Sequence, residues 1–403
     1  MRLLIVGFSH SIHVARWVAQ LADQGWDIHL FPSVDFGRVH PDIRGVTVHH
    51  SAFVRDGDVS VSFRGLSVPF QPVASGIRFL LRKTIRNYRV NQLVKLIRTL
   101  KPDIIHSLEM QAAGYLTLEA RKRLKNTFPP WIVTNWGSDI YFFGKLPEHE
   151  RRIREVLGSC DYYSCECRRD AELGRAFGFR GEMLPIMPNA GGFHIDSLAP
   201  LREHPTSGRR LIMLKGYQGW AGRALAGLKA LEQTTDVLHG YTIAIYSPSD
   251  KVVAAARRFM KVTGVKTIIV PVGTSHQDML RLHGKARISL GLSVSDALST
   301  SFLEALVMGA FPIQSWTSAA GEWIEHGRTG MLVPPDDTEV VGQAVRTAVT
   351  DDQLVDRASE ANDLLAREKL DYTKIKSIAI EMYRRIAFGR TPEKAGQEGS
   401  SRV

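Results

Sequence analysis

Cysteine is scarce in this sequence, and its placement excludes a disulfide framework. The 403-residue chain has three cysteines, Cys160, Cys165 and Cys167, all within one short segment. An odd number at this spacing does not fit a set of disulfides, and no second Cys or His pair completes a zinc-binding pattern. We therefore expect reduced thiols.

Long apolar runs are also absent. No stretch approaches the ~20 consecutive apolar residues that a membrane-spanning helix needs. The first apolar run, Arg2 to Gly7, is too short for a signal-peptide core, and it leads into Ser9, His10 and Ser11 instead of a cleavage site. These absences predict a cytoplasmic protein that does not cross a bilayer.

Acidic residues are outnumbered by basic ones. The chain has 52 Lys and Arg against 41 Asp and Glu, which gives a formal net charge of +11. Polyanions, anionic lipids and phosphorylated substrates all suit this charge, which by itself does not choose among them. Aromatic side chains interleaved with Arg and Lys, typical of nucleic-acid binding, are not evident. We therefore predict no nucleic-acid partner.

The chain is longer than one hydrophobic core usually supports, and strand-like and helix-like segments alternate along it. A strand over Arg2–Gly7, a helix over Ile12–Ala22 and a strand over Ile28–Phe31 form the strand–helix–strand unit that a parallel sheet requires. The alternation restarts with a strand over Arg210–Leu214. The pattern predicts an α/β protein with two Rossmann-like parallel-sheet domains.

Clusters of proline and glycine mark the boundaries between the predicted domains. They gather between Leu184 and Gly208 and indicate an interdomain connection. The predicted units are an N-terminal domain, a linker, a C-terminal domain, a helix that packs back on the N-terminal domain and a disordered tail. Their ranges are 1–190, 191–208, 209–370, 371–388 and 389–403. Within the first domain, the stretch from Ser51 to Ser75 suggests a hairpin or a mobile loop.

The strongest functional pattern follows a predicted strand over Ile288–Leu292. Asp296 lies in the loop after it, and Glu304 lies about one turn inside the next helix. Free backbone N–H groups at a helix N-terminus, on the carboxyl edge of a parallel sheet, suit a diphosphate. The residues expected there are Leu298, Ser299, Thr300 and Ser301. A capping box formed by Ser301 and Glu304 would explain part of the same pattern structurally.

This region resembles the donor-binding half of the family 4 retaining glycosyltransferases, which have the GT-B fold. The shared features are two acids separated by seven residues, here Asp296 and Glu304, and the sequence GRTGMLVP at 327–334. Further similar motifs are Ser11–Trp17, Pro102–His106, Trp136–Ile140 and Pro188–Ala190. The first acid is usually Glu, and a Gly-Phe-Gly is replaced here by residues 298–301. This departure leaves the bound sugar open.

The resemblance implies two Rossmann-like domains that face each other across a cleft, with the acceptor on the N-terminal domain and a nucleotide-sugar donor on the C-terminal one. The implied reaction is metal-independent transfer of a hexose-type unit to a hydroxyl group, with retention, in glycan, polysaccharide or glycolipid biosynthesis. The nucleotide sugar is a substrate, so no cofactor is expected. Glu304 would hold the ribose, and Asp296 the hydroxyls of the transferred sugar.

Two cations in a glycine-punctuated turn are candidates to offset the charge of the leaving diphosphate. Lys215 and Arg223 flank this turn, and preorganised cations stabilise charge that develops in a partly dry cleft. Asp139, after Gly137 and Ser138, is the candidate for positioning the acceptor or the transition state. The expected acceptor-side loop residues are Gly7, Ser9, His10, His13 and His106.

A basic stretch near residues 77–98 predicts an amphipathic helix. Its cations repeat at three or four residues, and such a helix can lie on anionic lipid, where each cation adds about 1 kcal/mol. The cations are Arg78, Arg82, Lys83, Arg86 and Arg89. The alternative is an ordinary helix with its apolar face in the core and its charges in water. If the helix contacts lipid, the protein would be peripheral at the inner membrane face, and its acceptor would be a lipid-linked saccharide or a membrane precursor.

Two other functions fit parts of the pattern. A sugar-nucleotide 2-epimerase of the same fold would keep the nucleotide site but would need further acid–base groups. A non-catalytic polyanion-binding protein would use the basic face alone. A saccharide or lipid-linked acceptor and a nucleotide-sugar donor are the partners that we expect.

Overall fold

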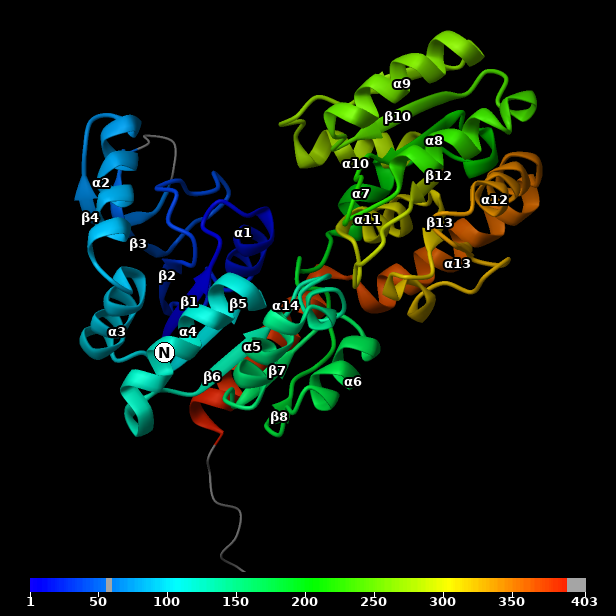
Figure 1. The fold of residues 1–403 in the computed structure, drawn as a ribbon. Helices are drawn as coiled ribbons and strands as arrows, with labels where there is room; N and C mark the ends of the chain where they lie inside the picture. Colours follow the sequence, from blue (N-terminus) through cyan, green and yellow to red (C-terminus); the bar gives the residue numbers. More distant parts are fainter. Residues whose placement is uncertain (56–59, 390–403) are drawn as a thin grey trace, which may run out of the picture.

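The computed structural model describes residues 1–55 and 60–389, so the predicted disordered tail lies outside the described residues except for Gly389. The chain forms two lobes, one built from its first half and the other mostly from its second half (Figure 1). A parallel β-sheet with helices around it forms the centre of each lobe. The predicted pair of α/β sheets is confirmed.

The sheet of the first lobe has eight strands in the order β4-β3-β2-β1-β5-β6-β7-β8, and every pairing is parallel. Strands β2 to β4 lie on one side of β1, and β5 to β8 lie on the other side. Open α/β sheets bind ligands at such a switch point, here between β1 and β5. The strands are β1 Arg2–Gly7, β2 Asp27–Pro32, β3 Thr47–Phe53, β4 Ser62–Ser67, β5 Ile104–Leu108, β6 Trp131–Thr134, β7 Tyr162–Ser164 and β8 Glu182–Met183. The helices between them are α1 Ile12–Ala19, α2 Gln71–Thr84, α3 Tyr88–Leu100, α4 Tyr115–Leu124, α5 Pro147–Leu157 and α6 Arg168–Ala176.

The sheet of the second lobe has six parallel strands in the order β11-β10-β9-β12-β13-β14. Its strand order reverses between β9 and β12, so the loops after these two strands open at the same edge. The strands are β9 Leu211–Lys215, β10 Thr242–Tyr246, β11 Lys266–Ile269, β12 Ala286–Gly291, β13 Phe311–Ser315 and β14 Met331–Val333. The remaining helices are α7 Ile195–Leu198, α8 Ala224–Glu232, α9 Asp250–Thr263, α10 His276–Lys285, α11 Thr300–Met308, α12 Thr338–Thr350, α13 Asp352–Lys369 and α14 Tyr372–Phe388.

The last helix, α14, returns from the second lobe to the first (red in Figure 1). Its apolar face joins the core around β1, where Tyr383 is fully buried together with Leu3 and Trp17. Trp17 Nε1 donates a hydrogen bond to the Tyr383 hydroxyl at 2.8 Å. Burying this apolar stripe in the first lobe is what ties the end of the chain to its beginning.

Two local expectations were wrong. The stretch from Ser51 to Ser75 is not a hairpin, because β3 and β4 pair in parallel and α2 begins at Gln71. Part of the alternative, a mobile loop, falls on residues 56–59, which lie outside the described residues. The basic stretch is not one helix, because α2 ends at Thr84 and α3 begins at Tyr88, with Asn87 between them in the left-handed region at a φ of 55°.

Helix α2 is only partly buried, and its side chains are not divided into a buried apolar face and an exposed charged face. Arg78 is buried, whereas Phe79 and Leu80 are well exposed. The explanation of this stretch as a helix with its apolar face in the core is therefore wrong for α2. It fits α3, in which Leu93 and Ile97 are buried.

Candidate functional site

A cavity of about 440 Å³, which we call the central cavity, lies between the two lobes. From the first lobe it is lined by α1 and by the loop that follows β6, and from the second by the loops that follow β9 and β12. The carboxyl ends of parallel strands are where open α/β sheets bind ligands, because the helix N-termini there present free amide groups. The predicted residues on its wall are His13, Asp139, Lys215, Asp296, Leu298, Ser299, Thr300, Ser301 and Glu304.

Lys215 and Asp296 form an ion pair on the wall of this cavity. Lys215 Nζ lies 3.1 Å from Asp296 Oδ2 and 3.3 Å from the hydroxyl of Ser293. The Lys215 side chain is only 8% exposed. A mostly buried ammonium group with hydrogen-bond partners on one side is held in a fixed direction, so it can meet a ligand oxygen without first reorganising.

The loops of the two lobes touch beside this ion pair. The Ser138 hydroxyl donates to the carbonyl of Ser295 at 2.9 Å. A Cβ atom added at Gly137 would lie 2.6 Å from Asp296 Oδ1, a distance that real Cβ contacts do not show. Glycine at position 137 therefore permits the approach that brings Asp139 and Asp296 to one cavity.

The first turn of α11 forms the floor of the site. Ser299 is the N-cap, and its hydroxyl accepts the backbone N–H of Phe302 at 3.2 Å. The capping box expected from Ser301 and Glu304 is therefore not formed, because the capping residue lies two positions earlier. The first backbone N–H groups of a helix have no acceptors within the helix. Those of this turn can therefore donate hydrogen bonds to an anion in the cavity.

Glu304 is buried in the same wall, with its side chain 7% exposed. His276 Nε2 lies 2.9 Å from its Oε1, and His283 Nε2 lies 3.7 Å from its Oε2. Burial alone would raise the pKa of Glu304, but the hydrogen bond from His276 and the nearby charges of the two histidines and Arg16 lower it below the ordinary value. The carboxylate is thus held ionised.

Asp139 contacts the backbone of its own lobe. Its Oδ2 accepts the backbone N–H groups of Met110 at 2.9 Å and of Trp136 at 2.8 Å. Burial raises the pKa of Asp139 to about 7, although these two hydrogen bonds act in the opposite direction. A carboxyl group with this pKa can hold or release a proton near neutrality.

The structure does not bring Arg223 to the cavity. Its guanidinium contacts the carboxylate of Asp336 and the carbonyl of Gly219, and it accordingly lies outside the cavity wall. Lys215 is the cation of the predicted pair that lines the site.

The acceptor-side residues are dispersed. His13 lines the central cavity, and His10 lines a second cavity in the first lobe. Gly7 ends β1, and the buried hydroxyl of Ser9 donates to the carbonyl of Arg38 at 2.6 Å. His106 is fully buried, with Tyr383 and Thr134 hydroxyls 2.6 and 2.7 Å from its two ring nitrogens.

Several residues on the cavity wall were not predicted as site residues from the sequence. They include Arg16, Glu166, Tyr217, Trp220 and His276. Glu166 follows the end of β7, so its place after a parallel strand could have drawn attention to it. It accepts the backbone N–H of Asn189 at 2.8 Å, and burial raises its pKa to about 8.

Glu166 predicts a pH dependence of stability. Its pKa rises from 4.5 to about 8 on folding, so the folded state retains a proton that the unfolded state has lost. The contribution of Glu166 to the free energy of unfolding therefore falls as the pH rises from about 4.5 to about 8. Glu166→Gln removes the charge, and it should raise the free energy of unfolding by about 1–3 kcal/mol above pH ~8 and change little near pH ~4.

Thermal unfolding followed across this pH range measures the effect. The matched control is Glu172→Gln, an exposed glutamate on α6 in the same lobe. If the melting temperatures of Glu166→Gln and of the unmodified protein run parallel at every pH, the buried-acid explanation is wrong.

Comparison with known proteins gives matches in both halves of the chain. Residues 2–157 match the family model described as "Glycosyl transferase 4-like", and residues 226–351 match "Glycosyl transferases group 1". A search of curated proteins finds no matching relative.

Solved structures resemble the chain over nearly its full length. Trehalose 6-phosphate synthase from Burkholderia multivorans has a TM-score of 0.69 at 13% identity, covering 100% of this chain and 99% of that one. Sucrose-phosphate synthase from Thermosynechococcus elongatus has a TM-score of 0.67 at 12% identity, with coverages of 96% and 99%. HepE of Anabaena in complex with UDP-glucose has a TM-score of 0.65 at 14% identity, with coverages of 95% and 99%. At these identities the likeness supports the fold.

Proposed function

Because the chain belongs to the family 4-like glycosyltransferases of GT-B type, we propose that it transfers a hexose unit from a nucleotide sugar to a hydroxyl group of an acceptor. Configuration at the anomeric carbon is retained. The observation that carries the proposal is the single cavity in which Lys215, Asp296, Glu304 and the first turn of α11 come together.

The donor occupies the wall formed by the second lobe. Glu304 accepts hydrogen bonds from the ribose hydroxyls, since its carboxylate is ionised and already oriented by His276. The amides of residues 298–301 bind the diphosphate, and Asp296 accepts from hydroxyls of the transferred sugar. The HepE structure in complex with UDP-glucose supports a UDP-hexose as the first donor to test.

The proposed reaction breaks the bond between the anomeric carbon and the diphosphate oxygen, and it forms a bond to the acceptor oxygen on the same face. The acceptor proton passes to the departing diphosphate, so no protein nucleophile takes part. Lys215 stabilises the charge that develops on the diphosphate, and no metal ion or cofactor is required. Asp139, in the loop after β6 of the first lobe, positions the acceptor hydroxyl.

We propose a separate role for each part of the chain. Residues 1–190 hold the acceptor, 191–208 link the domains, and 209–370 hold the donor, with 371–388 bracing the acceptor domain. The product belongs to glycan, polysaccharide or glycolipid biosynthesis.

We place the protein in the cytoplasm, with peripheral contact to anionic membrane. No helix among the described residues is long and apolar enough to cross a bilayer. Helix α2 supports the peripheral contact, because Phe79 and Leu80 are exposed beside the basic pair Arg82 and Lys83.

Incubation of the pure protein with UDP-glucose, other nucleotide sugars and a panel of saccharide and lipid-linked acceptors tests the proposal. Release of nucleoside diphosphate that depends on an acceptor, together with an α-linked product from an α-linked donor, is the expected result. Formation of an epimeric nucleotide sugar without any acceptor would make the chain a 2-epimerase. Failure to bind any donor would leave a non-catalytic polyanion-binding protein.

A further inference from the structure

A second cavity of about 480 Å³ lies in the first lobe, between the loop after β2 and helix α2. Among the described residues, its wall is rich in cationic groups and holds a single carboxylate. The lining residues are His10, Asp35, Phe36, Arg38, Gln71, Ser75, Arg78 and Arg82. Neither the family comparison nor the donor site accounts for this concentration of guanidinium groups.

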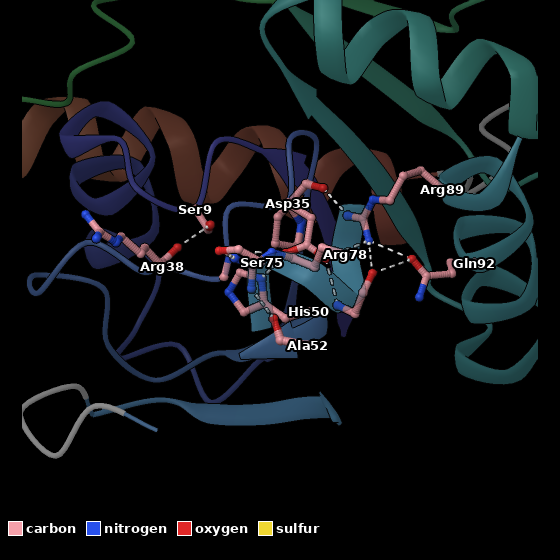
Figure 2. Close-up of polar contacts among 12 residues, drawn as sticks. Ser9, Asp35, Arg38, His50, Ala52, Ser75, Arg78, Arg89 and Gln92 are labelled. Atoms are coloured by element: carbon pink, nitrogen blue, oxygen red, sulfur yellow. Dashed lines mark hydrogen bonds and ion pairs between the residues drawn. The ribbon is translucent and has the colours of Figure 1, made fainter. Parts of the chain in front are cut away.

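Arg78 is built into the wall of this cavity. It is only 4% exposed, and its guanidinium donates to the carbonyl of Ala52 at 2.6 Å and to the hydroxyl of Ser75 at 2.9 Å (Figure 2). Both acceptors are neutral, and no carboxylate lies within ion-pair distance of Arg78 among the residues that the structure describes. A buried cation held only by neutral oxygens keeps its full charge available to an anion in the cavity.

The carboxylate of Asp35 on this wall is already bound by other groups. Asp35 Oδ1 lies 2.7 Å from His50 Nδ1, and its Oδ2 accepts the backbone N–H of Ser51 at 2.7 Å. Arg89, outside the cavity wall, lies 3.4 Å from the same Oδ2 (Figure 2). Asp35 therefore anchors the loop after β2, and its single charge is shared with His50 and Arg89.

Arg38 and Arg82 complete the cationic wall. Both are exposed, and neither forms an ion pair within the described ranges 1–55 and 60–389. Arg82 Nε donates to the carbonyl of Arg78 at 3.2 Å, which holds its stem against α2. The total charge of these three guanidinium groups is larger than that of the Asp35 carboxylate. Three such groups suit the several oxygens and the double charge of a phosphate.

An aromatic path joins this cavity to the proposed reaction site. Trp136 lines the central cavity, and its ring centroid lies 5.9 Å from that of Phe8. Phe8 lies 5.6 Å from His10, which lies 5.1 Å from Phe36 on the wall of the second cavity. A continuous series of ring contacts thus lies between the second cavity and the central one.

We propose that the second cavity binds a phosphate group of the acceptor, while the acceptor hydroxyl reaches the central cavity. The inference rests on the proposed function, and it names the acceptor class as a phosphorylated one. The phosphate belongs either to a soluble sugar phosphate or to a phospholipid-type carrier, and both present the same oxygens to the arginines.

Binding measurements on the full chain separate these sources. Isothermal titration with hexose 6-phosphate is compared with hexose, and phosphatidylcholine vesicles are compared with vesicles that also contain phosphatidic acid. The phosphorylated member of at least one pair should bind more tightly. Arg82→Gln and Arg38→Gln should each weaken that binding by about tenfold, since each removes a charge-assisted hydrogen bond.

Lys95→Gln is the control, because Lys95 is an exposed cation of the same lobe, on α3, that neither lines the cavity nor belongs to the proposed membrane contact. Equal losses in Arg82→Gln and Lys95→Gln would make the attraction a general surface effect and overturn the inference. The absence of any preference for the phosphorylated probes would overturn it as well. Binding of UDP-glucose should be unchanged in all three variants, so a protein that binds donor but no phosphorylated probe retains the proposed function and loses only this inference.

Discussion

Lys215→Ala should lower the turnover of the proposed transfer by about 10²–10³-fold, the range seen when one preorganised group opposite a developing charge is removed. Lys215 is the cation of the predicted pair on the cavity wall, and its ammonium is directed by Asp296 and Ser293. The donor affinity should fall much less than the turnover, because the charge on the diphosphate oxygen grows as the sugar leaves. Steady-state kinetics together with donor titration measure the two effects separately.

Arg223→Ala serves as an internal comparison for this result. From the sequence, both cations were expected to act on the diphosphate, whereas in the structure Arg223 contacts Asp336 and Gly219. We therefore expect Arg223→Ala to retain most of the turnover. Lys229→Ala, an exposed change on α8, controls for the loss of a positive charge from this lobe. Equal turnover in Lys215→Ala and Lys229→Ala would mean that the diphosphate lies elsewhere.

Glu304→Ala should weaken binding of the nucleotide sugar by about tenfold to hundredfold, because one or two hydrogen bonds from the ribose to an ionised group are lost. The effect should appear in the dissociation constant of the donor and in that of the nucleoside diphosphate alone. Thermal-shift titration or calorimetry with UDP and UDP-glucose measures it without an acceptor.

Glu304 is buried, so the variant requires a control for folding. Glu304→Gln keeps the shape of the side chain and one oxygen acceptor for His276 but removes the charge, and it should lose most of the same affinity. Glu325→Ala removes an exposed carboxylate from the same lobe and should bind the donor normally. If both Glu304 variants fold and bind donor as tightly as the unmodified chain, the ribose assignment is wrong.

Much of the fold could be predicted because the strands are short, apolar and regularly spaced. The strand predicted over Arg2–Gly7 is β1, and that predicted over Arg210–Leu214 corresponds to β9, at Leu211–Lys215. Parallel strands buried on both faces are continuous apolar runs, which stand out in a sequence. The segment from Ser51 to Ser75 was misjudged because glycine, proline and serine indicate a turn but do not say whether the strand that follows pairs in parallel.

The candidate site could be predicted in part for a similar reason. Asp296 and Glu304 belong to one loop and one helix, so their spacing in the chain already places them near each other. Glu166 comes from the other lobe, and His276 lies 28 residues before Glu304 at the start of α10, so only the packing of the elements brings them to this cavity. Arg223 shows the reverse case, since its partner Asp336 lies 113 residues away and turns it from the cavity.

The sequence by itself determined the two parallel sheets, the loop that holds Asp296 and the helix that holds Glu304, because local periodicity and spacing depend on neighbouring residues. Only the tertiary structure decided which charged groups meet. It directed Arg78 inwards on α2, paired Lys215 with Asp296 and left Phe79 in solvent. The physical reason is that burial and ion pairing depend on distances between residues far apart in the chain. These distances are fixed only when the helices and strands of each lobe have packed together.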